Sequence, residues 1–188
     1  MGKLGFDAFW GELSPCSHVV QICENDWEFL AHLIEFTAGG LIAGESVVLI
    51  VTPLHRHAIA KGLLEKGFDF GGAIKSDQLI ILDAQDTVAK FLVGEMPDEQ
   101  LFHKVIGSVL ERATRDGRKV RAFGEMVALL WARGLCGATI RLEHLWTDFC
   151  RKQAFSLFCA YPKAGFTENA SEDIARICNT HSAIFDPA

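Results

Sequence analysis

Residues 119–131 have the sequence KVRAFGEMVALLW, in which a Gly-Glu-Met corner separates two apolar runs. The first run predicts a buried strand, Gly124 allows a sharp turn, and the residues after Met126 predict a helix that covers a sheet. In an open α/β sheet such a corner lies at the carboxyl end of a strand, where these folds bind ligands. Glu125 is therefore either an acid presented to a ligand crevice or a carboxylate that stabilises the positive end of the following helix.

The rest of the chain alternates predicted strands with predicted helices. Apart from the strand that ends at Phe123, apolar runs predict strands at 18–23, 46–52, 78–83 and 155–161. Helical spacing and capping residues predict helices at 26–38, 53–66, 98–116, 138–152 and 171–179, and a short helix capped by Asp86. Gly39 and Gly40 are expected to end the first helix, and a segment after His181 can add an edge strand.

This order predicts the fold class. The run at 46–52 has no polar alternation, which is typical of parallel strands buried on both faces. We expect an α/β fold with three layers, α/β/α, and a mainly parallel sheet. Residues 1–188 are predicted to form one domain, with residues 1–16 as a loosely docked lead.

Composition excludes several classes of protein. The net charge is -6 and there is no long basic run, which argues against direct binding of nucleic acid. The first dozen residues carry acids and no continuous apolar stretch, so they do not resemble a signal peptide. No apolar stretch approaches the ~20 residues of a membrane helix. The chain is therefore predicted to be cytoplasmic, without contact to a membrane.

The cysteines and histidines do not predict a metal site. Six cysteines are scattered without a CxxC pair, which is typical of small buried hydrophobic residues in a reducing compartment. His55 and His57 are two residues apart, so on a helix they point in different directions. Neither a metal nor a cofactor is expected.

Several motifs together resemble a known family. The segments HVVQIC, GLIAGESVVLIVT, QLIILDA, VRAFGEMVALLW, LEHLW and LFCAYP are similar to those of the MEDS domain (methanogen/methylotroph, DcmR sensory) over nearly the whole chain. More distantly, the layout resembles RecA and KaiC-type ATPases. The MEDS resemblance implies a sensory domain that works with signalling or transcription modules and detects hydrocarbon derivatives.

The segment after the first strand departs from the ATPase pattern. A P-loop needs glycines and a lysine to hold phosphates, but residues 23–28 read CENDWE, with three acids and neither of these residue types. The place of a water-activating acid after the second strand is taken by Thr52 to His55. His55 can act as a base in principle, but a lone histidine at a helix start is more often a surface or capping residue. No ATP hydrolysis is expected.

Polar residues at the predicted strand ends suggest a ligand crevice. The candidate ligand-binding residues are Gln21, Cys23, Thr52, His55, Asp83, Glu125, Met126 and Tyr161. Trp131 and Trp146 either wall this crevice or pack as ordinary core between helix and sheet. His18, Arg121 and Glu143 are candidates for buried polar pairs that fix the fold.

Three function classes remain open. The favoured one is a non-enzymatic sensory or regulatory module that binds a small organic ligand and signals to a protein partner in a transcription or kinase pathway. The alternative is a nucleotide-binding protein or enzyme of RecA/KaiC-like fold, in which Glu125 and Asp83 act as acid-base or magnesium groups. The third is an interaction domain that forms a homo-oligomer.

Overall fold

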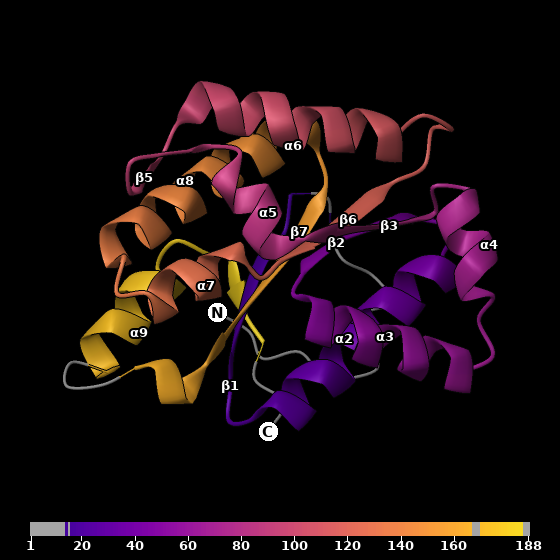
Figure 1. Ribbon diagram of the computed structural model, residues 1–188, viewed down its shortest axis with the longest axis horizontal. Helices are drawn as coiled ribbons and strands as arrows, with labels where there is room; N and C mark the ends of the chain where they lie inside the picture. Colours follow the sequence, from indigo (N-terminus) through magenta and orange to yellow (C-terminus); the bar gives the residue numbers. More distant parts are fainter. Residues whose placement is uncertain (1–13, 15, 167–169, 186–188) are drawn as a thin grey trace.

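The computed structural model describes residues 14, 16–166 and 170–185. Within them, six strands form one sheet in the order β3-β2-β6-β7-β1-β8, and every neighbouring pair is parallel. Helices cover both faces of this sheet (Figure 1). The prediction of a three-layer α/β/α fold is therefore confirmed. The lead at 1–16 lies almost entirely outside the described residues.

The elements follow the predicted alternation. The strands of the main sheet are β1 (His18–Cys23), β2 (Ser46–Val51), β3 (Leu79–Asp83), β6 (Val120–Gly124), β7 (Ser156–Pro162) and β8 (Ala183–Ile184). The helices are α2 (Asp26–Ile42), α3 (Pro53–Glu65), α4 (Phe70–Lys75), α5 (Ala84–Ala89), α6 (Glu99–Ala113), α7 (Met126–Ala132), α8 (Cys136–Gln153) and α9 (Ala170–Cys178). A short hairpin joins β4 (Leu92–Val93) to β5 (Met96–Pro97), and a 3-10 turn, η1 (Lys163–Gly165), follows β7.

Successive residues of the buried strands point to opposite faces of the sheet and pack against different groups of helices. In β2 all six residues are buried, and Val48 and Ile50 pack with α5 to α9, whereas Val47 and Leu49 pack with α2 to α4. Figure 1 shows these two groups of helices on opposite sides of the sheet. Strands buried on both faces need continuous apolar sequence, which is the pattern that predicted them.

The end of α2 corrects one prediction. Gly39 and Gly40 do not end this helix, which continues to Ile42 and is followed by Gly44 at φ +71°. Gly40 is needed for a close approach instead, because a Cβ atom there would lie 2.6 Å from Cγ2 of Val47. The glycine lets α2 pack directly against β2.

The start of α5 corrects a second prediction. Asp83, and not Asp86, caps this helix, since its Oδ1 accepts a hydrogen bond from the backbone N–H of Asp86 at 2.8 Å. Helix α4 and the hairpin were not predicted as elements. The edge strand after His181 is present as β8, which pairs with β1. In the described ranges, no helix combines the length and apolarity that crossing a membrane requires.

Candidate functional site

The sheet order places the carboxyl ends of β2, β6, β7 and β1 side by side. A cavity of about 150 Å³ lies at these ends, between the starts of α2 and α3 and the helix α7. We call it the carboxyl-end cavity. Its lining is Cys23, Asn25, Asp26, Phe29, His55, Glu125, Ala128, Leu129, Ala132, Ala160, Tyr161 and Pro162. The cavity therefore joins an apolar wall to a few polar groups, which is the composition of a small-molecule site.

Glu125 directly follows β6 and precedes the first residue of α7. Its side chain makes no capping hydrogen bond to α7. Instead, Oε2 accepts a hydrogen bond from the backbone N–H of Thr52 at 2.8 Å, and Oε1 lies 2.8 Å from Nδ1 of His55. The carboxylate thus joins the end of β6 to the junction of β2 and α3, so it does more than begin a helix.

His55 and Glu125 form a hydrogen-bonded pair in the cavity wall, which also includes Asp26. The hydrogen bond to Glu125 raises the pKa of His55, against the effect of burial, and the negative charge of Asp26 acts in the same direction. The two side chains are 14% and 10% exposed. The His55 ring and the Glu125 carboxyl group together offer hydrogen-bond partners to the polar part of a ligand.

Cys23 lines the cavity but is not an activated nucleophile. Burial, assisted by the carboxylates of Glu28 and Asp26, raises the pKa of Cys23 to about 12. At neutral pH the side chain is a thiol, and only a thiolate attacks readily.

Side chains of the segment between β1 and α2 accept hydrogen bonds from backbone N–H groups near the start of α2. The Asn25 side chain accepts a hydrogen bond from the N–H of Glu28, and Oε2 of Glu28 accepts one from the N–H of Glu24, both at 2.9 Å. Oε1 of Glu28 accepts from the side-chain amide of Gln21 at 3.3 Å. Phosphates bind backbone N–H groups at a helix start, and here the side chains of Glu28 and Asn25 already accept from two N–H groups of this segment, those of Glu24 and Glu28.

Four of the residues predicted from sequence meet at the cavity: Cys23, His55, Glu125 and Tyr161. Thr52 lies beside them and contributes its backbone N–H to Glu125. The remaining three do not line it. Gln21 is fully buried against His32, Asp83 caps α5 on the far side of β2, and Met126 is fully buried beneath α7.

The two tryptophans belong to the core. Trp146 is 1% exposed and packs edge-to-face on Phe102, and Trp131 is 8% exposed and donates to the carbonyl oxygen of Gly165. The apolar wall comes instead from Phe29 and from one face of α7, which sequence reasoning missed. The spacing of Ala128, Leu129 and Ala132 on one helix face was an available signal.

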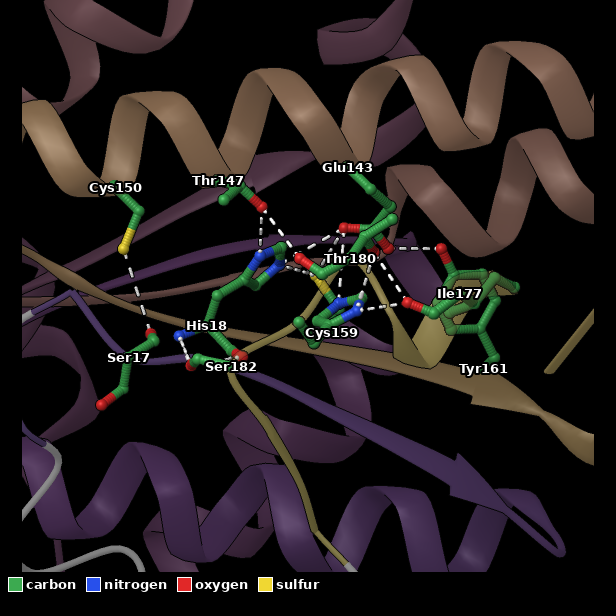
Figure 2. A network of polar contacts seen from close by, with 11 residues as sticks. Ser17, His18, Glu143, Thr147, Cys150, Cys159, Tyr161, Ile177, Thr180 and Ser182 are labelled. Atoms are coloured by element: carbon green, nitrogen blue, oxygen red, sulfur yellow. Dashed lines mark hydrogen bonds and ion pairs between the residues drawn. The ribbon is translucent and has the colours of Figure 1, made fainter. Parts of the chain in front are cut away.

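A second group of polar residues is buried between β1, β7 and α8. It contains His18 of β1, Glu143 of α8, Cys159 of β7 and His181, which follows α9, and we call it the buried His–Glu cluster. Figure 2 shows His18, Glu143 and Cys159 pointing toward one another. One donor atom from each of the four residues lies within 4.8 Å of the others. These four residues are far apart in the chain, so no ligand spacing in the sequence predicts a metal site here.

Glu143 is the charged centre of this cluster. Burial opposes its ionisation, but His181, His18 and the hydroxyl of Tyr161 outweigh burial and lower the pKa of Glu143 to about 2. Burial lowers the pKa of His181 to about 4 and raises that of Cys159 well above its usual value. The hydroxyl of Tyr161 donates to Oε1 of Glu143. Because Tyr161 also lines the carboxyl-end cavity, the two groups of residues share one side chain.

Arg121 lies apart from both sites. Its guanidinium pairs with Glu45 and donates to the carbonyl oxygen of Phe36 at 3.1 Å. His18 and Glu143, by contrast, contact each other, with Nε2 and Oε2 separated by 3.3 Å. All three residues predicted as structural polar groups are therefore buried beside polar partners.

The chain matches the model of one protein family, MEDS, the methanogen/methylotroph, DcmR sensory domain, over residues 17–182. The chain belongs to the MEDS family. The matched range of this MEDS domain includes every residue of the carboxyl-end cavity and of the buried His–Glu cluster. Membership indicates a sensory or regulatory role. No curated protein matches the chain.

Proposed function

We propose that this MEDS domain is a non-enzymatic sensory module that binds a small organic molecule in the carboxyl-end cavity and transmits the binding to a protein partner. The observation that carries the proposal is the cavity itself, with an apolar wall and the paired side chains of His55 and Glu125. A hydrogen-bonded side-chain pair that connects separate strands and helices can pass a ligand-induced shift from one element to another. Here Glu125 connects β6 and α7 to the start of α3.

The size of the cavity restricts the ligand. Its volume is about 150 Å³, and an apolar cavity of ~150 Å³ holds a molecule the size of benzene. Drug-sized ligands and nucleotides need larger pockets, of ~300 Å³ or more. We therefore propose an uncharged ligand of a few heavy atoms, such as a short alcohol or a halogenated alkane, with its polar substituent at His55 and Glu125.

The electrostatics support binding without catalysis. The Cys23 thiol has a raised pKa, and the start of α2 is occupied by Glu28, which would repel a triphosphate. We propose that the protein neither hydrolyses ATP nor binds it tightly, which argues against the nucleotide-binding alternative.

Two exposed apolar side chains support the proposal of a protein partner. Trp27 is 79% exposed and Leu54 is 73% exposed. Trp27 follows Asp26 and Leu54 precedes His55, so each is adjacent in the chain to a residue that lines the cavity. A signalling or transcription protein that contacts them would be sensitive to the state of the cavity.

Ligand titration on a cavity-filling variant tests the proposal. Short alcohols and halogenated alkanes are screened by thermal shift, and the compounds that stabilise the wild type are then titrated by calorimetry. Ala128→Leu places a larger side chain on the cavity face of α7 and should abolish their binding. Ala175→Leu, on an exposed face of α9, is the matched control and should bind as the wild type does.

Three results would count against the proposal: no stabilising compound of this size, unchanged binding to Ala128→Leu, or saturable micromolar binding of Mg-ATP. The last result would favour the nucleotide-binding alternative.

A further inference from the structure

Both histidines of the buried His–Glu cluster use Nδ1 to bind the surrounding chain. Nδ1 of His181 lies 2.8 Å from the carbonyl oxygen of Ile177, and because a carbonyl oxygen only accepts, Nδ1 carries the proton. Nδ1 of His18 lies 2.9 Å from the hydroxyl of Thr147, which itself donates to the carbonyl oxygen of Thr180 at 3.1 Å. The hydroxyl therefore accepts from His18. In the neutral form of either ring, Nε2 therefore carries a lone pair and no proton.

Both Nε2 atoms face the same carboxylate oxygen. Oε2 of Glu143 lies 3.3 Å from Nε2 of His18 and 3.4 Å from Nε2 of His181. His181 is 8% exposed, and its Nε2 has no hydrogen-bond partner among the described residues. A buried lone pair beside a carboxylate is repulsive unless a cation lies between them. The cation is either a proton or a metal ion.

Four of the six distances between the candidate ligand atoms are close to those found around a metal ion. With bonds of ~2.0 Å to nitrogen or oxygen and ~2.3 Å to sulfur, the ligand atoms of tetrahedral zinc lie about 3.3 to 3.6 Å apart. Two such separations are the contacts of Oε2 with the histidines given above. Two more are 3.4 Å between Cys159 Sγ and His18 Nε2 and 3.7 Å between Cys159 Sγ and Glu143 Oε2, and all six separations among the four ligand atoms lie within 4.8 Å.

We propose that the buried His–Glu cluster is a structural site for one divalent transition-metal ion, with Zn²⁺ as the expected occupant. Two imidazoles, a thiolate and a carboxylate are ligands that zinc accepts, and four protein ligands leave no open position for a substrate. Binding replaces the thiol proton of Cys159, which is released to solvent. The charge of Zn²⁺ then balances one thiolate and one carboxylate, so the buried site is neutral.

The surroundings orient each ligand as metal sites require. The histidines are held through Nδ1, and Oε1 of Glu143 accepts from Tyr161, which leaves Oε2 for the metal. A cavity of about 100 Å³ adjoins His18 and His181, and its lining includes the exposed residues Arg151, Asn179 and Ser182. This cavity offers a path from solvent to the site. The proposal does not depend on the ligand of the carboxyl-end cavity.

The first experiment measures metal in the wild-type protein. The untagged chain, purified without chelators, should contain about one zinc ion per molecule by plasma mass spectrometry. Unfolding it in the presence of a chelator should remove the metal, and refolding with equimolar Zn²⁺ should restore it and raise the melting temperature. A metal-free protein that takes up no Zn²⁺ on refolding and unfolds identically with and without it would overturn the proposal in favour of a proton-bridged cluster.

The second experiment identifies the ligands with Co²⁺. Wild-type protein refolded with Co²⁺ should show the d–d absorption of a tetrahedral ion and a sulfur-to-cobalt charge-transfer band. Cys159→Ser should lose that band, whereas Cys150→Ser, a change at another buried cysteine of the same region, should keep it. A band that survives in Cys159→Ser refutes the assigned donor set. If Cys159→Ser does not fold, absence of the band in the wild type refutes it equally.

A third variant tests the hydrogen bond that Tyr161 donates to Glu143. Tyr161→Phe removes the hydroxyl that holds Oε1 of Glu143 and keeps all four ligands. Loss of such a contact typically weakens metal binding 10- to 100-fold. Competition with a zinc-binding dye should show a weakening of about this size, and unchanged affinity would contradict the proposed orientation of Glu143.

Discussion

The molecule contains two histidine–glutamate pairs whose surroundings differ. His55 and Glu125 lie at the wall of a cavity, with side chains 14% and 10% exposed. His18 and Glu143 lie in the interior, with side chains 2% and 0% exposed. Glu125 has one histidine and one backbone N–H as partners, whereas Glu143 is surrounded by two histidines, a thiol and a phenol.

This difference shows how the surroundings of a residue type determine its role. A partly exposed carboxylate can exchange a protein partner for a ligand at a small cost in free energy, because water solvates the charge while it has no other partner. A fully buried carboxylate cannot, since any lost partner leaves an unpaired charge in a medium of low polarity. This contrast agrees with the proposal that the first pair responds to a ligand and the second maintains the fold.

The largest expected effect comes from Glu143→Ala. The change removes the buried carboxylate that accepts from Tyr161 and that the imidazoles of His18 and His181 face, which should cost about 3 to 5 kcal/mol of unfolding free energy. Urea denaturation measures the loss. Glu111→Ala, at an exposed position of α6, is the control and should change stability by less than about 0.5 kcal/mol. A loss for Glu143→Ala no larger than that for Glu125→Ala would contradict the structural role of the buried pair.

Glu125→Ala should have an intermediate effect on stability and a large one on binding. It leaves the N–H of Thr52 and the ring of His55 without their acceptor, at about 1 to 3 kcal/mol. Glu125→Gln preserves size and one acceptor oxygen, so it should retain the fold and still weaken ligand binding. Denaturation and calorimetric titration of both variants give the two quantities. Compounds that stabilise Glu125→Ala as much as the wild type would remove Glu125 from the site.

A smaller effect is expected on the pH dependence of stability. The pKa of His55 is raised above 6.5 in the folded protein by Glu125, with Asp26 nearby. A raised folded-state pKa means that the folded protein binds the proton more tightly than the unfolded chain does. The stabilisation is complete below the unfolded value of 6.5 and is lost as pH rises through the folded pKa. Denaturation of wild type and His55→Gln from pH 6 to 8.5 should show a decline only in the wild type; parallel curves would contradict the ion pair.

The smallest effect on stability is expected at Trp27 and Leu54. Both side chains are largely exposed, so Trp27→Ser and Leu54→Ser should each change unfolding free energy by no more than about 0.5 kcal/mol. Ligand affinity should be retained while binding to a signalling partner is weakened. Loss of ligand binding in either variant would mean that these residues belong to the cavity and not to a partner surface.

The sequence was sufficient for most of the fold, for identifiable reasons. Continuous apolar runs such as that of β2 predict parallel strands because both faces are buried, and caps such as Asn25 and Asp98 satisfy local backbone groups. The errors were equally local. Gly40 resembles a helix end, yet its position is set by the approach of β2, which is distant in sequence.

The candidate site was predictable only in part. Glu125 was identifiable because a corner after a buried strand lies at the ligand-binding edge of such a sheet. Its partner was not, since Arg121, His55 and Tyr161 were all available, and the order β2-β6-β7 determines that His55 is the residue within reach. Asp83 does not line the carboxyl-end cavity because β3 lies at the sheet edge, beyond β2.

The sequence by itself determined the succession of strands and helices, the family, and the acidic β1–α2 segment, because each depends on residues that are close together in the chain. Only the tertiary structure decided which carboxylate meets which histidine. His18, Glu143, Cys159 and His181 have no common spacing, and they meet because β1 pairs with β7 while α8 and the end of α9 pack over both. Contacts between distant segments depend on sheet order and helix packing, and no local pattern encodes them.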